Sequence, residues 1–491
     1  MGKHVPGQWV GVFGERGLPL LPGTRGLLAD LDSDQISSMR LVARLIQRDP
    51  GLALSVVRTA NAVPHRHFHS EVVSLDEAAM MIGIQGILRC MENVMPLERL
   101  LDPAAQARYL QVAARSAYTA LLAEVWGDIR HDMIPAEVSL AGLFYNLGEL
   151  VLAAHEERRI QRYLSLMADS SVLPHEAEYV ALDLSLRAMG HQLAESWQLP
   201  EMVRHCMRPA NARHLRTLGV MLAAKLAREA MRGWCSPGLV GDLRLAAEYL
   251  DVDAETVVTQ INRVSGEFNL YGDLYGIMAP IPELQIEDIA EQLRQGPTSP
   301  APAFCLAPRS DRFAQAEARL QAAASADEDE VVEVLLAGLH HGLGLNRVVF
   351  ARLEDGGERL VPASMEGTDY EPDFNRATID LNGRHLLTVL MRRPASFWLN
   401  PGNVAEMWPQ VPESLRAAIG VQEFFAHSLF AGEHPVGMVY ADRRSRACAL
   451  DKRALAGFNR LTTLAQAELL RLQQAAGARP RPRAEPIRTL R

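Results

Sequence analysis

The chain has few cysteines, no long apolar run and no surplus of positive charge, and each lack excludes a class of protein. Its five cysteines are far apart and form no Cys-x-x-Cys pair, so the sequence predicts reduced thiols rather than a disulfide framework. No stretch has the roughly 18 uninterrupted apolar residues of a membrane helix, and the N-terminus lacks a signal-peptide pattern. The net charge of −9 and the sequence pI near 6.0 argue against a protein that coats nucleic acid. We therefore expect a cytoplasmic protein without membrane contact, for which nucleic acid is not a favoured partner.

Familiar catalytic motifs are also missing. The sequence contains no Gly-x-x-x-x-Gly-Lys-Ser/Thr phosphate loop, no Gly-x-Ser-x-Gly nucleophile turn and no His-Glu-x-x-His zinc helix. His65, His67 and His69 alternate and could share a zinc ion with Glu71, but a loop without a metal is the favoured interpretation. From the sequence we expect no cofactor.

The clearest local signals lie in the first hundred residues and indicate helices. Asp49 suits an N-cap, and Pro50 suits the first helical position, where a missing N–H costs nothing. Ser74 and Glu77 form the spacing of a capping box. The helix that starts there is expected to end at Gly83, because glycine is favoured just after a helix. Most periodic segments up to about residue 293 follow the same helical spacing.

The sequence motifs in these segments resemble those of one family. Residues 41–62 read LxxxLIQRDPxLxxxVxRxANA and residues 72–83 read VxSLDEAxxxIG, after the lead-in LPLLP at 18–22. Residues 190–200 follow G-x-x-L-A-x-x-W-x-L-P. In this order, the motifs resemble those of the HDOD family, the HD-related output domains, over roughly the first half of the chain. The resemblance implies an all-helical domain that acts as an interaction or output module in bacterial-type signalling.

HDOD domains are similar to HD phosphohydrolases, which hold metal through a His, a His-Asp pair and a later Asp on separate helices. At the matching places this chain has Arg115 and the pair Tyr145-Asn146, while residues 220–225 contain no carboxylate. A guanidinium has no lone pair to give, and neutral tyrosine and asparagine are poor ligands for a hydrolytic metal. We therefore predict a degenerate site with no catalytic residue and no metal. Arg115 is expected to pair with a carboxylate, and Glu149 is the first candidate.

Four regions are expected along the chain. The proline-rich run around residues 296–312 cannot lie inside a helix or a central strand and is predicted to be a linker. The region before it, 1–295, is the predicted helical domain, and the region after it, 313–476, is the predicted mixed domain. The tail at 477–491 contains five arginines and three prolines and is expected to be disordered.

The region after the linker has a different pattern. Residues 346–353, 424–430 and 435–442 are rich in β-branched and apolar residues and are predicted strands. A helix is predicted over 451–474, so the region should form an α+β sandwich. It is similar to a GAF domain, chiefly through PVGMVYADRR at 435–444.

These expectations favour a multidomain, non-enzymatic regulatory protein. The HDOD-like domain would bind other signalling proteins, and the GAF-like domain would serve as a sensor of a small molecule or as a dimerisation module. The alternative is a divergent HD-type metal-dependent phosphohydrolase acting on nucleotides or cyclic nucleotides. A third interpretation is nucleic-acid binding by the arginine-rich tail.

Overall fold

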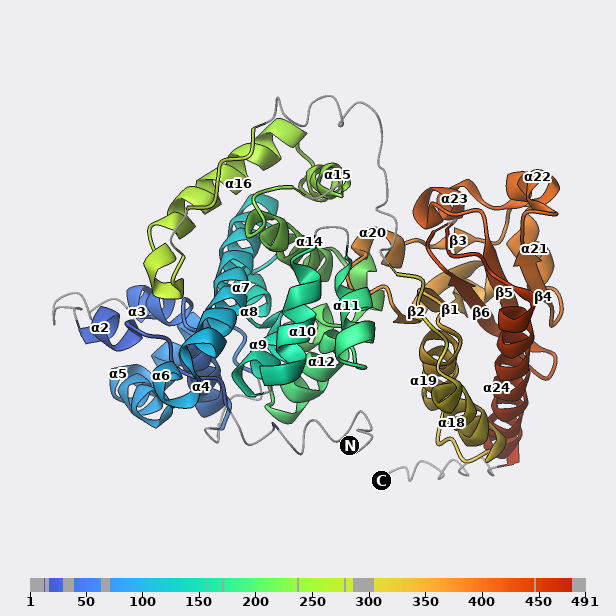
Figure 1. Cartoon of the computed structure of the whole chain (residues 1–491), viewed down its shortest axis with the longest axis horizontal. Helices are drawn as coiled ribbons and strands as arrows, with labels where there is room; N and C mark the ends of the chain where they lie inside the picture. The colour runs from blue at the N-terminus through green and yellow to red at the C-terminus, as the bar shows by residue number, and fades with distance from the viewer. Residues whose placement is uncertain are drawn as a thin grey trace, which may run out of the picture. The chain divides into compact units, whose positions relative to one another are not determined.

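The chain folds into two compact units (Figure 1). The helical unit comprises residues 1–304 and 368–376, and the sheet unit comprises residues 305–367 and 377–491. The division falls inside the segment predicted as a linker, and the chain enters the helical unit a second time at 368–376. The computed structural model describes residues 13, 17–29, 39–62, 71–155, 157–169, 172–235, 238–277, 280–285, 304–445 and 447–478.

The described part of the helical unit is almost entirely helical, which confirms the predicted helical N-terminal domain. Its long central helix is α7 (Pro103–Arg130), against which α8, α9, α14 and α16 pack. Its elements are α2 (Thr24–Ala29), α3 (Met39–Ile46), α4 (Pro50–Ala62), α5 (Leu75–Asn93), α6 (Leu97–Leu100), α7, α8 (Pro135–Phe144), α9 (Leu147–His155), α10 (Glu157–Met167), α11 (Pro174–Ala181), α12 (Leu186–Ser196), α13 (Glu201–Cys206), η1 (Pro209–Arg213), α14 (Leu215–Ala230), α15 (Leu239–Leu250), α16 (Ala254–Asn269), η2 (Gly272–Tyr275) and α20 (Pro372–Asn375).

Asp49 caps α4 and also fastens an earlier segment to it. One carboxylate oxygen accepts hydrogen bonds from the backbone N–H groups of Gly51 and Leu52, at 2.9 and 3.0 Å. The other accepts from the Leu21 N–H at 2.8 Å and from the Thr24 hydroxyl at 2.7 Å. Because Asp49 is fully buried, these donors replace the water that the carboxylate loses on folding.

The capping signal before α5 is present, and Gly83 interrupts the helix where the sequence predicts its end. The Ser74 hydroxyl accepts a hydrogen bond from the Glu77 N–H at 3.2 Å, as an N-cap does. Gly83 has φ +65° and ψ 174°, which is not helical, and a second helical stretch that was not predicted follows directly across this kink. The chain resumes a helix to Asn93 because the next turns bury Ile87 and Cys90 in the core.

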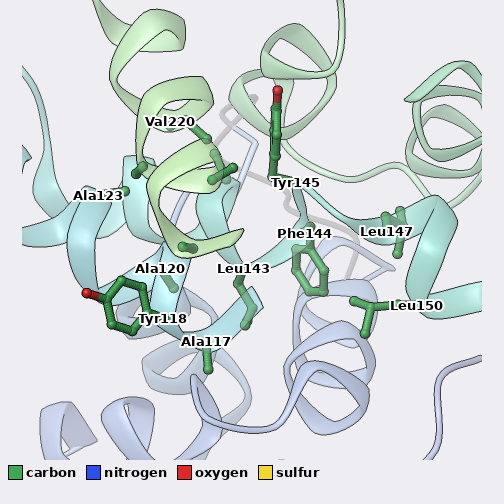
Figure 2. Packing of buried hydrophobic residues seen from close by; sticks show 14 of the residues in the cluster. Ala117, Tyr118, Ala120, Ala123, Leu143, Phe144, Tyr145, Leu147, Leu150 and Val220 are labelled. Carbon is green, nitrogen blue, oxygen red and sulfur yellow. The ribbon is translucent and has the colours of Figure 1, made fainter. Parts of the chain in front are cut away.

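Helices α8 and α9 form the apolar centre of the unit and are separated at Tyr145 and Asn146. By length and composition alone, residues 135–155 could cross a membrane, but 94% of the apolar window is buried inside the structure. That burial is typical of core helices. Figure 2 shows Phe144 directed toward Leu150 and Tyr145 extending the opposite way. The break therefore sends one ring into the apolar core and the other toward a cluster of polar side chains.

The sheet unit is built on an antiparallel sheet with strand order β3-β2-β1-β6-β5-β4. Three helices, α18 (Ser310–Gln321), α19 (Glu328–Ala337) and α24 (Lys452–Ala478), pack together, and their apolar residues share one core with β1, β5 and β6. The strands are β1 (Arg347–Glu354), β2 (Arg359–Glu366), β3 (Ile379–Asp380), β4 (Ser396–Leu399), β5 (Phe424–Ala431) and β6 (His434–Asp442). Short helical elements join them: η3 (Gly338–Gly342), η4 (Asp355–Gly357), α21 (Leu386–Leu390), α22 (Val404–Met407), η5 (Trp408–Gln410) and α23 (Glu413–Ile419).

The predicted α+β character of this region is confirmed, and the three predicted strands correspond to β1, β5 and β6. Strand β2 was not predicted. It contains Pro362, which lies beside a register shift between Phe350 and Ala351 of the neighbouring strand β1. Because proline cannot donate a hydrogen bond to a sheet, it is tolerated at such irregularities.

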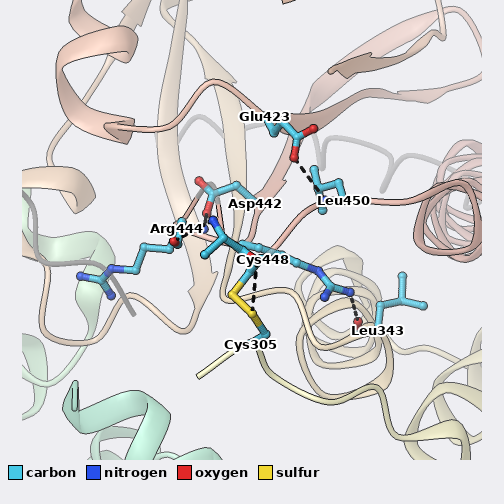
Figure 3. Close-up of a disulfide and its surroundings, with 10 residues drawn as sticks. Cys305, Leu343, Glu423, Asp442, Arg444, Cys448 and Leu450 are labelled. Carbon is cyan, nitrogen blue, oxygen red and sulfur yellow. Dashed lines mark hydrogen bonds between the residues drawn. A yellow bond between two sulfur atoms is a disulfide. The ribbon is translucent and has the colours of Figure 1, made fainter. Parts of the chain in front are cut away.

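The expectation of reduced thiols is wrong for two of the cysteines. Cys305 and Cys448 form a disulfide within the sheet unit (Figure 3). They are 143 residues apart in sequence, so no local spacing indicates the bond. Near this bond, the backbone N–H of Leu450 donates to Glu423 at 3.3 Å. The remaining cysteines, Cys90, Cys206 and Cys235, are free.

Candidate functional site in the helical unit

The site predicted from the sequence lies where α7 and α9 meet, and its charges neutralise each other. Arg115 of α7 forms an ion pair with Glu149 of α9 through Nη2 and Oε2. The two side chains are only 12% and 3% exposed. This is the pairing that the sequence predicts for Arg115. A buried charge needs such a partner, because an unpaired one would have lost its hydration without compensation.

Tyr145 and Asn146, at the break between α8 and α9, also have internal partners. The Asn146 amide donates to the Ser116 hydroxyl at 3.5 Å. The Tyr145 ring lies beneath the guanidinium of Arg187, whose Cζ is 3.2 Å from the ring centroid, and Arg187 also donates to the Tyr145 carbonyl. Burial raises the pKa of Tyr145 to about 12, so its phenol stays neutral at physiological pH.

These side chains do not fit a hydrolytic metal. Such a metal needs imidazole or carboxylate donors that converge from separate helices. Here a guanidinium, a phenol and an amide stand in those places, and at the third helix Lys225 is paired with Asp242. Among the described residues, no group of three or more His, Cys, Asp and Glu side chains is arranged to hold a metal ion. The alternating residues His65, His67 and His69 lie outside the described residues.

The other half of this polar cluster carries no motif in the sequence. Arg187 of α12 and Arg228 of α14 lie beside the ring of Tyr370, with Cζ atoms 5.1 and 4.6 Å from its centroid. The Tyr370 hydroxyl donates to Glu178 Oε1, and the Leu186 N–H donates to Glu178 Oε2 at 3.1 Å. The aromatic ring thus lies near two cations while its hydroxyl contacts a carboxyl group.

The electrostatics follow from deep burial beside several charges. Burial, together with the neighbouring carboxyl of Asp369, raises the pKa of Glu178 to about 8, although the hydrogen bonds from Tyr370 and Leu186 and the charge of Arg187 lower it. Burial also raises the pKa of Asp369, against the opposing effect of Arg187 and of the Ser185 hydroxyl, which donates to Asp369 at 3.1 Å. Burial tends to lower the pKa of Arg228, but the surrounding phenols and carboxyls raise it overall. Arg228 therefore remains a cation.

Tyr370 belongs to the inserted segment, residues 368–376, which is part of the helical unit although it comes late in the sequence. At its far end, Arg376 makes a two-pronged pair with Glu248, with N–O distances of 3.0 and 2.9 Å. Between the two ends, α20 packs against η1 and α14 (Figure 1). Within the segment, the Asn375 amide donates to the Thr368 carbonyl at 2.8 Å.

The structure therefore links Tyr145 to a larger cluster through Arg187, and the charge of Glu149 acts on Arg228. Charged residues on the buried faces of α11, α12 and α14 could have been noticed as breaks in an apolar helical pattern, since buried charges require partners. No local signal could have found Tyr370, because its contact with Glu178 joins residues 192 apart.

Comparison with known proteins identifies the first part of the helical unit. The HDOD domain family model matches residues 18–212, less than half of the chain. An uncharacterised protein of Treponema pallidum is 25% identical over 169 residues, covering 34% of this chain and 32% of that protein. The chain thus aligns with about a third of that relative's length.

Two solved structures match this chain at low identity and with TM-scores below 0.5. The MmoQ response regulator of Methylococcus capsulatus is 20% identical, with 51% of this chain and 99% of that chain covered and a TM-score of 0.40. An HDOD domain protein of unknown function from Geobacter sulfurreducens is 17% identical, with 55% and 98% covered and a TM-score of 0.33. The motif order, the helical architecture and the family match agree: residues 18–212 are an HDOD domain.

Proposed function

We propose that the chain is a non-enzymatic signal-transduction protein of the cytoplasm whose HDOD domain acts as a protein-interaction or output module. The observation that carries this proposal is the Arg115–Glu149 ion pair. In the phosphohydrolases that the domain resembles, a metal-binding histidine stands at the place of Arg115. Here that place has a buried cation, and the nearby carboxylate is already paired with it. An additional divalent cation would meet a guanidinium rather than a lone pair.

We further propose that the sheet unit is a GAF-like sensor or dimerisation module. The antiparallel strand order β3-β2-β1-β6-β5-β4 and the packing of α18, α19 and α24 against the central strands support this proposal. The resemblance of residues 435–444 to a GAF sequence supports it as well. Its partners would be a small-molecule ligand, a second copy of the chain, or both. Sedimentation of the full chain over a wide concentration range tests for the dimer, and a strictly monomeric chain would contradict that part of the proposal.

The non-enzymatic proposal is tested by elemental analysis and a hydrolysis assay on the full chain. We expect no stoichiometric transition metal and no turnover of cyclic dinucleotides or nucleotides with added Mn²⁺. The variant Asn146→Asp restores one carboxylate and should remain inactive, because the other ligands are still missing. Bound metal at one equivalent, together with turnover that Tyr145→Ala abolishes, would contradict the proposal and favour a divergent phosphohydrolase.

A further inference from the structure

The polar cluster of the helical unit is filled by a piece of chain with the composition of a peptide ligand. The inserted segment reads Thr-Asp-Tyr-Glu-Pro-Asp-Phe-Asn-Arg from 368 to 376. Its regular structure is a single short helix, α20 (Pro372–Asn375), and it is anchored mainly through side chains. Nothing in so short a piece would hold its shape alone, since isolated helices of this length are not stable in water. Its conformation therefore depends on the surface that receives it.

That surface recognises an acidic aromatic sequence through separate contacts. The ring of Tyr370 lies near the guanidinium groups of Arg187 and Arg228, an arrangement favoured by the negative face of an aromatic ring. Its hydroxyl reaches Glu178, so a tyrosine is favoured over a phenylalanine. Asp369 is held by the Ser185 hydroxyl and lies within the electrostatic influence of Arg187. Each contact binds a different group of the segment: the ring of Tyr370, its hydroxyl, or the carboxyl of Asp369.

The second anchor lies at the other end of the segment and is weaker. Arg376 pairs with Glu248, whose side chain is 63% exposed, and it also contacts Asp373 within the segment. Exposed pairs contribute little because water screens them. The exposed pair of Arg376 thus adds little, and the segment is held mainly at Tyr370 and by the buried side chains of Phe374 and Asn375.

We propose that the cluster around Arg187, Arg228 and Glu178 is a peptide-binding site for acidic segments with a tyrosine, and that residues 368–376 of the same chain are its reversible resident occupant. The tether at both ends raises the local concentration of the segment, so weak contacts suffice to keep the site filled. Release of the segment would expose the guanidinium groups of Arg187 and Arg228 beside the carboxyl of Glu178. This proposal does not depend on whether the chain is an enzyme.

The first test is hydrogen–deuterium exchange on the unaltered full chain. The N–H groups of Glu371, Asn375 and Arg376 donate to backbone carbonyls within the segment and should be protected. In Tyr370→Ala we expect at least a tenfold faster exchange of these amides, and a rise in exchange at residues 174–190. Val389→Ala is the control, because that side chain is 57% exposed and lies outside the segment and outside the cluster that receives it. Exchange of the segment at the rate of an unstructured peptide in the unaltered chain would overturn the proposal.

The second test asks whether the site accepts the segment as a separate molecule. The variant Asp369→Ala/Tyr370→Ala/Arg376→Ala should vacate the site in the full chain. A fluorescent peptide of residues 366–377 should then bind this variant at least tenfold more tightly than the unaltered chain, as measured by anisotropy. A peptide with alanine in place of Tyr370 should not bind. Equal binding to both proteins, or no binding to a folded variant, would refute a peptide site.

Discussion

The Cys305–Cys448 disulfide has an effect on stability that can be calculated from the length of the loop it closes. It closes a loop of 143 residues, which contains the whole strand set of the sheet unit. The chain-entropy relation assigns such a loop about 5 kcal/mol at 25 °C, and measured values for native disulfides are commonly about 2–4 kcal/mol. We therefore expect reduction to lower the free energy of unfolding of the sheet unit by about 3 kcal/mol.

Calorimetry with and without a reductant measures this effect. For a unit of this size, about 3 kcal/mol corresponds to a fall of about 6–12 °C in Tm. The variant Cys305→Ser/Cys448→Ser should unfold at the lower temperature under both conditions, and Cys235→Ser should behave like the unaltered chain because Cys235 is free. Under denaturing, non-reducing conditions, thiol titration should find the thiols of Cys90, Cys206 and Cys235 only.

A titration that finds all five cysteines of the sequence as thiols would refute the reasoning, as would an unchanged Tm on reduction. The thiol titration also bears on where in the cell the protein is located. Disulfides are rare in the cytosol, where glutathione keeps thiols reduced. If the free thiols are alkylated while the chain is being isolated, the titration shows whether the disulfide is present in the cell. The same result tests the proposed cytoplasmic location.

The remaining predictions concern the helical unit. Glu149→Gln should destabilise it by about 3 kcal/mol, since it strands the cation of Arg115, whereas Arg115→Met/Glu149→Leu should cost far less; urea unfolding compares the two variants. Burial raises the pKa of Glu178 to about 8 from an ordinary 4.5, so its contribution is fully present below about pH 4.5 and is lost as the pH rises through about 8. The stability difference between Glu178→Gln and the unaltered chain should therefore shift in favour of the variant over that range, and a pH-independent difference would contradict the assignment. Asp49→Ala should cost about 2–3 kcal/mol in the same urea assay, because buried donors lose their acceptor, and a loss below about 0.5 kcal/mol would show that they do not need it.

Local chemistry explains why parts of the fold could be predicted from sequence. Asp49 and Ser74 mark helix starts because their side chains accept hydrogen bonds from backbone groups only a few residues away. Gly83 interrupts the helix through its positive φ, which is also a local property, but whether a second helical stretch follows depends on the burial of Ile87 and Cys90. Glycine alone cannot distinguish a kink from an end.

The site could be predicted only in part because its two halves have different origins. Arg115 was placed by a motif position, and its candidate partner Glu149 lies on α9, a helix that packs against α7. Tyr370 reaches the cluster from beyond two strands of the other unit, and the partner of Cys305 is equally remote. Such contacts depend on how the whole chain is connected, so they cannot be predicted from a local residue pattern.

The second entry of the chain into the helical unit has a consequence for how the protein is made. During synthesis, helices α2 to α16 leave the ribosome before the inserted segment exists, because β1 and β2 come first. The nascent helical unit must therefore hold Arg187, Arg228 and Glu178 without their aromatic partner while the sheet is begun. Contacts that span so many residues also slow folding, since a long loop must close before they form. A shortened gene that stops at the boundary near Phe304 would make this transient state permanent.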